Sequence, residues 1–402
     1  MKRPGMKTTV AACYTGYVTQ AIVNNFAPLL FVTFNTDYGI SLSLISVMIA
    51  VNFGMQLLVD FLASVFVDRI GYRPCLVGAH FFVCAGLVLL AVLPDLLPSP
   101  AAGLFIATAV YGIGGGLIEV LVSPVIESCP LKNKKSQMSL LHSFYCWGQL
   151  AVVALSTVFF LFLGVERWEI LACVWAVIPF LNMIAFLFVP MYSPAKGETV
   201  SAPLKTVASS GFFWVFAFLI FLAGCTELGV SQWASSFAET ALGVSKTTGD
   251  LLGPCMFALL MGASRLLYAL AGEKWNLRVS LLAASLLCTA GYGLCAFAPD
   301  SLPWLGLAGC AVVGFGCGIM WPGIFSYAAV KIPEGGTALF ALLAFAGDLG
   351  CMAGPSSVGW VADAFGGDLS SGLALGIAFP AVMAIVLLFF RTDRGKDKRT
   401  LS

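Results

Sequence analysis

The feature of this sequence that most constrains its fold is a series of twelve apolar segments, each about twenty residues long or longer. A helix of about 20 apolar residues spans the hydrocarbon core of a bilayer. Charged residues make up only 10% of the chain, whereas a soluble domain carries about 25%. We therefore expect an all-α membrane protein. The predicted spans are residues 8–34, 42–67, 74–93, 101–126, 138–163, 168–190, 211–238, 249–271, 279–298, 304–330, 337–361 and 371–390.

The lysine and arginine residues indicate how these spans are oriented, because short cytoplasmic loops carry the positive charge. If both termini lie inside the cell, 18 of the 21 Lys and Arg residues fall in inner segments. The outer loops then hold Arg167 and Lys246, and Arg265 lies within a span. The basic start, Met1–Lys7, precedes an apolar stretch too long for a signal peptide, so the first helix is expected to stay uncleaved. We predict a multi-pass protein of the plasma or inner membrane with both termini cytoplasmic.

The chain also divides into two related halves. The longest polar interruption, residues 192–210, follows the sixth span and is rich in Ser, Pro, Lys and Thr. It predicts a six-helix half over 1–190, a cytoplasmic linker over 191–210, and a six-helix half with a short cytoplasmic tail over 211–402. Glycines recur at a constant offset of 202 residues: Gly112 and Gly314, Gly114 and Gly316, Gly116 and Gly318, Gly148 and Gly350. Glycines are common in membrane helices, but several matches at one offset favour a repeat.

Pseudo-symmetric six-helix halves are typical of transporters that hold their solute between the halves, near the membrane midplane. The run Gly112–Gly116 follows no predicted strand, so close helix packing explains it better than a dinucleotide fingerprint does. The loop after the second span reads Asp68-Arg69-Ile70-Gly71-Tyr72-Arg73. It resembles the acidic–basic–Gly–basic signature of the major facilitator superfamily. The resemblance implies that Asp68, Arg69 and Arg73 latch helix ends together on the cytoplasmic face.

A narrower resemblance covers most of the chain. The fourth span reads Gly114-Gly115-Gly116-Leu117-Ile118-Glu119, then Ser123-Pro124. This is similar to the fucose permease branch, the fucose/glucose/galactose:proton symporters, with Ser123 in place of an Asn. Asn24-Asn25 in the first span, Leu141-His142-Ser143-Phe144 with Gly148 in the fifth, and Glu227 with Trp233 in the seventh also match that branch. One position departs from it: Pro28 stands where the branch carries an Asp used in proton coupling or substrate binding.

Ionisable side chains at membrane depth are costly and are therefore functional candidates. They are Asp60, Glu119, Glu127, Glu227, Arg265 and Asp348. Because desolvation favours the neutral form of a carboxyl group, such a group can carry a proton. We expect Glu119 to be the main proton-coupling residue, with Asp348 and Glu227 as alternatives. The competing interpretation is a protonated acid that only packs helices. We assign Arg265 to the cytoplasmic latch rather than to a substrate, and Asp60 to a solvated or latch role.

Uncharged polar residues on the same spans are candidates for binding a solute. They are Asn24, Asn25, Gln20, His142 and Gln232, together with Trp233 as a flat aromatic face. A sugar needs hydrogen-bonding partners for its hydroxyls and an apolar surface for the C–H face of its ring. Polar residues in membrane helices also hold helices together, so some of these will be structural.

We therefore expect a secondary transporter that works by alternating access, moves a small polar solute such as a sugar, and couples to protons. Efflux of amphipathic compounds, which the 32 Phe residues would suit, and uncoupled facilitation are the alternatives within transport. An intramembrane enzyme or a sensor is the alternative outside it. The sequence has no Walker motif and no paired cysteine spacing, so we expect no enzymatic activity, cofactor or metal. The expected partners are solute, protons and the lipid bilayer, without nucleic acid, and the chain is expected to be a monomer.

Overall fold

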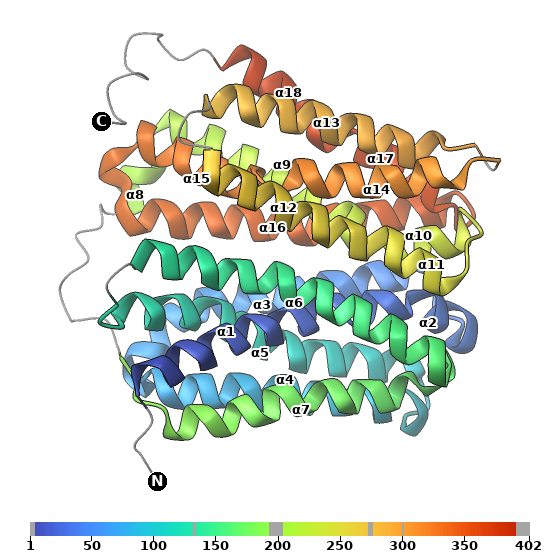
Figure 1. Ribbon diagram of the computed structural model, residues 1–402, viewed down its shortest axis with the longest axis horizontal. Coiled ribbons are helices and arrows are strands. Elements are labelled where there is room, and N and C mark those ends of the chain that lie inside the picture. The colour runs from blue at the N-terminus through green and yellow to red at the C-terminus, as the bar shows by residue number, and fades with distance from the viewer. Residues whose placement is uncertain (1–4, 132–133, 193–203, 272–275, 300, 391–402) are drawn as a thin grey trace. The chain divides into compact units, whose positions relative to one another are not determined.

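The computed structural model describes residues 5–131, 134–192, 204–271, 276–299 and 301–390 of the 402-residue chain. Within these ranges, the side chains of residues 64–66, 68, 134–137, 139, 204, 205, 269, 271, 334 and 336–338 are not described. The described residues form helices and turns, with no strand among them (Figure 1).

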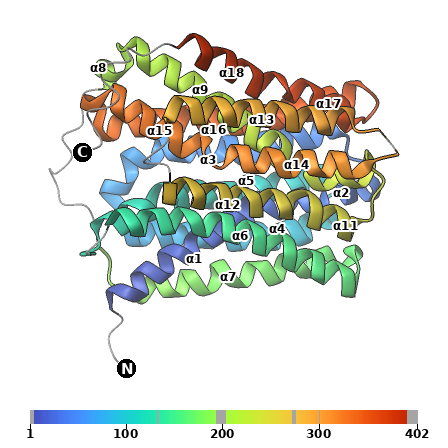
Figure 2. The same ribbon diagram turned by 45° about the horizontal axis from the view of Figure 1, so that its top comes forward.

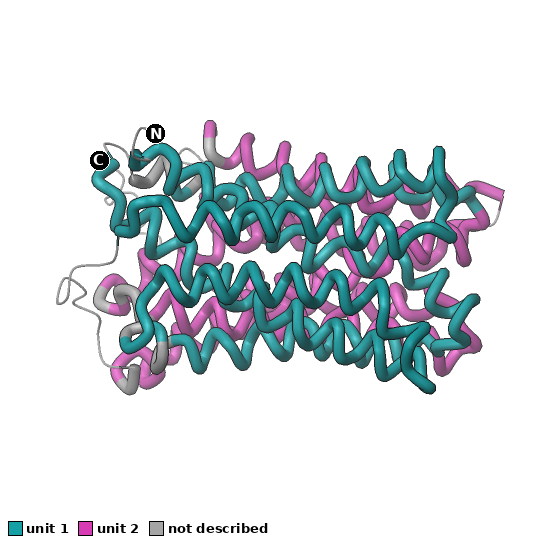
Figure 3. The backbone as a smooth tube through the Cα atoms, turned by 90° about the horizontal axis from the view of Figure 1, so that it is seen from below, with its two compact units in different colours: residues 1–198, 244–251 teal, residues 199–243, 252–402 magenta. Residues whose placement is uncertain are grey.

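The chain forms two compact units (Figure 3). Unit 1 comprises Met1–Glu198 with Val244–Leu251, and unit 2 comprises Thr199–Gly243 with Leu252–Ser402. The helices of unit 1 are α1 (Met6–Asn25), α2 (Phe31–Tyr38), α3 (Leu42–Ile70), α4 (Tyr72–Leu96), α5 (Pro100–Ser128), α6 (Lys134–Leu163), α7 (Trp168–Phe188) and the short α11 (Lys246–Asp250). The long helices of this unit run along one common direction (Figures 1 and 2).

Unit 2 is built from ten helices in its described residues. These are α8 (Leu204–Ala208), α9 (Gly211–Ser231), α10 (Ala234–Thr240), α12 (Met256–Ala271), α13 (Leu277–Phe297), α14 (Pro303–Cys317), α15 (Met320–Lys331), α16 (Gly336–Ala364), α17 (Leu369–Gly376) and α18 (Ala378–Phe389).

Twelve helical segments of the described chain are long and apolar enough to cross a membrane, which confirms the twelve predicted spans. Their ends follow the local sequence. Ser41 and Ser99 cap α3 and α5 by accepting hydrogen bonds from backbone N–H groups of the first turn. Gly71 links α3 to α4 at a φ of 93°, a conformation that side chains with a Cβ rarely adopt.

Several spans are interrupted in a way that the spacing of apolar residues did not predict. The first span consists of α1, a 3₁₀ turn η1 (Ala27–Leu30) and α2. Pro28 lies at the start of η1, where a residue without an N–H group is tolerated. Further breaks separate α9 from α10, α14 from α15 and α17 from α18, and a π-helical turn η3 (Leu251–Cys255) precedes α12.

The glycine repeat has a physical basis in equivalent helix contacts. In unit 1, a Cβ added at Gly112 would lie 3.1 Å from the carbonyl oxygen of Asn52 on α3, and one at Gly116 would lie 2.8 Å from Cα of Gln56. In unit 2, Gly314 meets the backbone of Phe257 on α12, and Gly318 meets the carbonyl of Met261. The other two pairs behave in the same way. Gly114 packs on α4 and Gly316 on α13, while Gly148 of α6 packs on α1 and Gly350 of α16 packs on α9. Each half therefore uses its glycines to bring the corresponding helices together.

Candidate functional site

A chain of hydrogen-bonded side chains crosses α1, α3 and α5 in unit 1. Nε2 of Gln20 donates to Oε2 of Glu119 at 3.0 Å and to Oε1 of Gln56 at 2.7 Å. Nε2 of Gln56 then donates to Oδ1 of Asn24 at 2.9 Å and to Oδ1 of Asn52 at 3.1 Å. Nδ2 of Asn52 completes the chain with a 3.1 Å bond to Asn24. The structure thus brings three of the predicted residues, Gln20, Asn24 and Glu119, into one network.

The two ends of this network differ in exposure. The four amide side chains are buried, with 3–6% of their surface exposed. Glu119 is exposed, so the carboxyl group is the accessible end of a buried polar chain. Gly115 of α5 leaves room for these amides, because an added Cβ there would lie 3.1 Å from Oε1 of Gln20 and 3.3 Å from Cδ of Gln56. Because each amide of the network is hydrogen-bonded to the next, the position of Glu119 is tied to three helices.

An aromatic group lies beside the carboxyl end of the network. The hydroxyl of Tyr17 is 3.1 Å from Oγ of Ser123, which follows Glu119 by one turn of α5. Tyr17 also meets the ring of His142 edge-on, with centroids 5.2 Å apart. Tyr14 stacks on Phe144 at 4.5 Å, and both rings are half-buried. These contacts join α1, α5 and α6 and leave His142 exposed.

Asn25 is not bonded to the amide chain formed by its neighbour Asn24. Its Nδ2 donates to the carbonyl of Ala21 at 2.9 Å and to the hydroxyl of Tyr145 at 3.5 Å. The paired asparagines of the first span therefore point to different partners: Asn24 to the amides of α3, and Asn25 to the aromatic side of α6.

In unit 2, Glu227 of α9 lies against Arg265 of α12. Their closest charged atoms, Oε2 and Nη2, are 3.9 Å apart. Glu227 is 7% exposed, and its Oε2 has no hydrogen-bond partner among the described residues. The described structure thus places Arg265 beside a carboxyl group of α9, the first membrane span of its own unit. Asp348 lies half-buried near the middle of α16, on a separate helix.

Trp233 lies at the break between α9 and α10 and is fully buried. Its indole Nε1 donates to the carbonyl oxygen of Pro355 at 2.8 Å, within unit 2. Gln232, beside it, is 3% exposed. In this conformation the ring of Trp233 packs inside the unit and offers no face to a solute. In unit 1, Tyr17 contacts Ser123 of α5, Tyr145 contacts Asn25, and the half-buried rings of Tyr14 and Phe144 stack on each other.

One arginine of the predicted latch, Arg73, binds the end of another helix. Arg73, at the start of α4, donates to the carbonyls of Phe186, Leu187 and Val189 at the end of α7. Arg278 repeats this contact in unit 2, donating to the carbonyls of Leu387 and Leu388 at 2.7 Å. Cationic side chains are favourable at helix C-termini, where carbonyls lack intrahelical partners. Arg69 is exposed at the end of α3, and the side chain of Asp68 lies outside the described residues.

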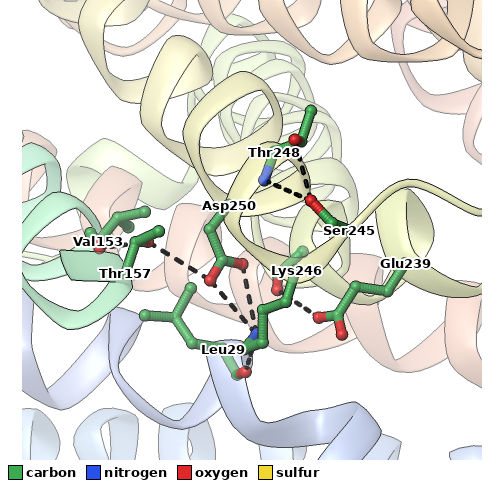
Figure 4. Close-up of polar contacts among 9 residues, drawn as sticks. Leu29, Val153, Thr157, Glu239, Ser245, Lys246, Thr248 and Asp250 are labelled. Atoms are coloured by element: carbon green, nitrogen blue, oxygen red, sulfur yellow. Dashed lines mark hydrogen bonds and ion pairs between the residues drawn. The ribbon is translucent and has the colours of Figure 1, made fainter. Parts of the chain in front are cut away.

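One charged pair was missed by the sequence reasoning, which did not place Asp250 among the acids at membrane depth. Asp250 is fully buried and forms an ion pair of 3.3 Å with Lys246, one turn earlier on α11 (Figure 4). Lys246 also donates to the carbonyl of Leu29 at 2.6 Å, in the 3₁₀ turn that contains Pro28. Thr157 of α6 donates to Asp250 at 3.4 Å. The i, i+4 spacing of Lys246 and Asp250 was the available signal.

Comparison with known proteins places this architecture in a family. The model of the Major Facilitator Superfamily matches residues 13–355. The chain belongs to the major facilitator superfamily. It is 26% identical over 329 residues to an uncharacterised MFS-type transporter of Yersinia pestis, in an alignment that covers 81% of this chain and 79% of that protein. It is 28% identical over 180 residues to the membrane protein MosC of Rhizobium meliloti, covering 45% of this chain and 43% of MosC.

A solved structure shows the same architecture. The crystal structure of a D-xylose-proton symporter matches with a TM-score of 0.75 over 96% of both chains, at 16% sequence identity. At this identity the likeness is one of fold. The superfamily membership confirms the resemblance drawn from the Asp68–Arg73 signature, and the chain is a multi-pass membrane transporter of this family.

Proposed function

We propose that this chain is a secondary transporter of a small neutral polar solute, with a monosaccharide as the substrate class, and that it couples transport to protons through Glu119. The observation that carries the proposal is the hydrogen-bonded chain from Asn52 to Glu119, which joins buried amides to one exposed carboxyl group. A carboxyl group is the side chain that can take up and release a proton as the transporter changes conformation.

The surroundings of Glu119 support a sugar as the solute. Amides and hydroxyls are suited to neutral hydroxyl groups, and no ion pair to Glu119 occurs in the described part of the chain. The half-buried rings of Tyr14 and Phe144 supply the apolar surface that the C–H face of a sugar requires. The matched solved structure is named as a sugar-proton symporter, which agrees with this class. We assign Asn25, His142 and Tyr145 to solute contact and Gln20 and Asn24 to the support of Glu119.

The orientation in the membrane follows from charge. Inner segments under the predicted topology hold 18 of the 21 Lys and Arg residues, so we propose that both termini face the cytoplasm of a plasma or inner membrane. Single cysteines placed at Lys196 and Lys398 of a cysteine-free chain test this in intact cells. Labelling of either by an impermeant maleimide would reverse the assignment.

The transport experiment uses the full chain in proteoliposomes with radiolabelled D-xylose, L-fucose, D-glucose and D-galactose, and with ethidium as an amphipathic cation. Accumulation is measured under an imposed pH gradient, and exchange is measured at equal pH. We expect at least one sugar to accumulate in response to the gradient. Export of ethidium without sugar uptake would favour efflux, and sugar exchange without a response to the gradient would identify a facilitator.

The variant Glu119→Gln separates coupling from binding. It keeps the shape of the side chain and most of its hydrogen bonding but cannot change charge. We expect gradient-driven accumulation to be lost and exchange at equal pH to continue. Glu166→Gln, at an exposed acid in the turn that follows α6, is the control and should leave both activities unchanged. Accumulation that survives in Glu119→Gln would move the proton-carrying role to Asp348 or Glu227.

A further inference from the structure

Four buried cysteines of unit 2 have no role in the proposed function. They lie in two pairs between α13 and α14, which pack against each other (Figures 1 and 2). Sγ of Cys288 is 3.9 Å from Sγ of Cys317, and Sγ of Cys295 is 3.8 Å from Sγ of Cys310. All four side chains are at most 1% exposed. The sequence shows no paired spacing because each cysteine meets a partner on the other helix.

The two pairs follow the register of the helices. On each helix the two cysteines are seven residues apart, which is almost two turns, so they share one face. The helices run antiparallel, because the earlier cysteine of α13, Cys288, meets the later cysteine of α14, Cys317. Each cysteine therefore faces a single partner, and the other pair lies about 10 Å away along the helix axis.

Glycines allow the two helices to come this close. A Cβ added at Gly309 would lie 2.6 Å from the carbonyl oxygen of Gly291 and 2.7 Å from Sγ of Cys295. A Cβ added at Gly316 would collide with Sγ of Cys288. On α14 a glycine thus precedes each cysteine and leaves room for a thiol of α13. The contacts between the sulfurs are set by the packing of the helix backbones.

Both pairs repeat the same hydrogen-bond pattern. Sγ of Cys288 donates to the carbonyl of Val313 at 3.5 Å, and Sγ of Cys295 donates to the carbonyl of Gly306 at 3.5 Å. A thiol carries a single proton, so the proton between the two sulfurs of each pair comes from the cysteine of α14. The sulfur of α13 accepts it. A lone pair of the α13 sulfur is therefore directed at the α14 sulfur.

The surroundings favour a disulfide over a bound metal ion. In the part of the chain that the structure describes, no group of three or more His, Cys, Asp or Glu side chains could hold a metal. Metal binding also requires deprotonated thiols, and their charge is costly in an apolar interior. A disulfide is neutral. Its sulfurs are about 2.05 Å apart, so each pair must close by less than about 2 Å, a movement that side-chain rotation can supply.

The pair of Cys288 and Cys317 lies at the break in the tenth span. Cys317 is the last residue of α14, and α15 begins at Met320. Gly318, inside the break, lies against the carbonyl of Met261 on α12. A covalent bond from Cys317 to α13 would fix the end of α14 where the span is interrupted. It would restrict any movement of α15 relative to α14.

From this geometry we propose that the pairs Cys288–Cys317 and Cys295–Cys310 are two sites of oxidative modification, at each of which a peroxide converts two thiols to a disulfide. One thiol takes an oxygen atom from hydrogen peroxide and becomes a sulfenic acid, and one water is released. The second sulfur attacks the sulfenic sulfur, the S–S bond forms, and the S–O bond breaks. The leaving hydroxide takes the proton of the attacking thiol as a second water. Two thiols thus lose two protons and two electrons, and the peroxide is reduced to two waters.

The experiment tests each pair by cross-linking, without any solute. A protease cleavage site is inserted between Ala298 and Pro299, in the connection from α13 to α14, in the full chain. The chain also carries Cys351→Ala, so that Cys310 and Cys317 are the cysteines that follow the cut. The purified protein is treated with hydrogen peroxide, blocked with N-ethylmaleimide, cleaved, and separated on a denaturing gel without reductant. A disulfide keeps the two fragments together, and dithiothreitol separates them.

Two variants keep one pair each. Cys288→Ala with Cys317→Ala keeps Cys295 and Cys310, and Cys295→Ala with Cys310→Ala keeps the other pair. We expect peroxide to hold the fragments of both together. The matched control is Cys295→Ala with Cys317→Ala, which keeps Cys288 and Cys310. These two are out of register by seven residues, so their fragments should separate. The melting temperatures of the reduced variants check that all three are folded.

Three results would overturn parts of the proposal. Fragments of the matched variants that separate after peroxide would show that the thiols only pack the helices, even if copper–phenanthroline links them. Equal cross-linking of the control would show that the register does not select the partner. In proteoliposomes, the variant that keeps Cys288 and Cys317 should lose uptake on oxidation and regain it with dithiothreitol. Unchanged uptake at complete cross-linking would refute the restraint on the tenth span.

The uptake measurement rests on the proposed function, whereas the cross-linking measurement does not. Failure of every sugar in the proteoliposome experiment would refute the proposed substrate and leave the disulfides in place.

Discussion

Gly116 of α5 lies against the backbone of Gln56 of α3, so closely that an added Cβ would be 2.8 Å from both Cα and the carbonyl oxygen of Gln56. This contact fixes the interface between α3 and α5, the helices that carry Gln56 and Glu119 of the polar network. Since the obstructing atoms belong to the backbone, a larger residue at this position forces one helix to move.

The first prediction is that Gly116→Ala destabilises the protein by about 1–3 kcal/mol, the usual cost of overpacking. The matched control is Gly78→Ala on α4, where an added Cβ would meet no atom within 4 Å. Gly78→Ala should be neutral, or stabilising by up to about 1 kcal/mol through helix propensity. The melting temperatures of both variants in detergent, compared with that of the wild type, measure the two changes in stability. Equal melting temperatures would show that α3 and α5 can move apart at this contact without a loss of stability.

The second prediction concerns Trp233, which is fully buried and bonded to Pro355. Trp233→Phe should cost about 1 kcal/mol through the lost hydrogen bond, and sugar uptake at low concentration should continue. Trp233→Ala should cost about 3–5 kcal/mol because it leaves a cavity. If Trp233→Phe instead abolishes uptake at an unchanged melting temperature, the side chain contacts the solute, as the sequence suggested.

The third prediction concerns the half-buried Lys246 and its fully buried partner Asp250. Removing one partner leaves an uncompensated charge, so Lys246→Met or Asp250→Asn alone should cost about 3–5 kcal/mol. The double variant Lys246→Met with Asp250→Asn removes both charges and should be more stable than Lys246→Met alone. Melting curves of the three variants form the comparison. A double variant whose loss equals the sum of the single losses would mean that the two residues act independently.

The fourth prediction concerns pH and Asp368, which caps α17 outside the membrane-spanning segments. Desolvation acts to raise the pKa of Asp368, but hydrogen bonds from the Ser371 hydroxyl and from the backbone N–H groups of Ser370 and Ser371 outweigh it, so the pKa is lowered. A group with a lowered folded-state pKa stabilises the protein above its unfolded pKa of about 3.9, and this contribution is lost as pH falls through the folded value.

Asp368→Ala should therefore cost about 1 kcal/mol near neutral pH, as for other helix caps. The difference from the wild type should shrink as the pH falls below about 4. Melting temperatures of the two proteins over that range provide the measurement. A constant difference at all pH values would show that the cap does not depend on the charge of the carboxylate.

The twelve spans could be predicted because bilayer thickness fixes the length of each helix and the apolar runs reveal it. The glycine offset favoured a repeat, and the repeated glycines lie at corresponding helix contacts in the two units, since a residue without a side chain marks where backbones approach. Both signals can be read along the chain itself. They depend on no knowledge of which helix lies beside which.

The candidate site was predictable only in part. Spacing along one helix shows which residues share a face but not which neighbouring helix that face meets. Asp60 was therefore assigned a solvated or latch role, whereas its Oδ1 is buried without a hydrogen-bond partner among the described residues. Trp233 was expected to face a solute, but the break after α9 turns it into the unit. Both differences come from helix rotation and helix breaks, which composition and periodicity leave undetermined.

The placement of α11 has a consequence for how the chain can be divided. Residues 244–251 pack in unit 1, although the chain enters and leaves them from unit 2. A gene split between residues 198 and 199 would therefore encode an N-terminal fragment that lacks Lys246 and Asp250, the residues that contact its Leu29 and Thr157. Only the C-terminal fragment can donate them. The N-terminal fragment alone would then be an incomplete unit, and functional complementation would require α11 of the C-terminal fragment to pack into it.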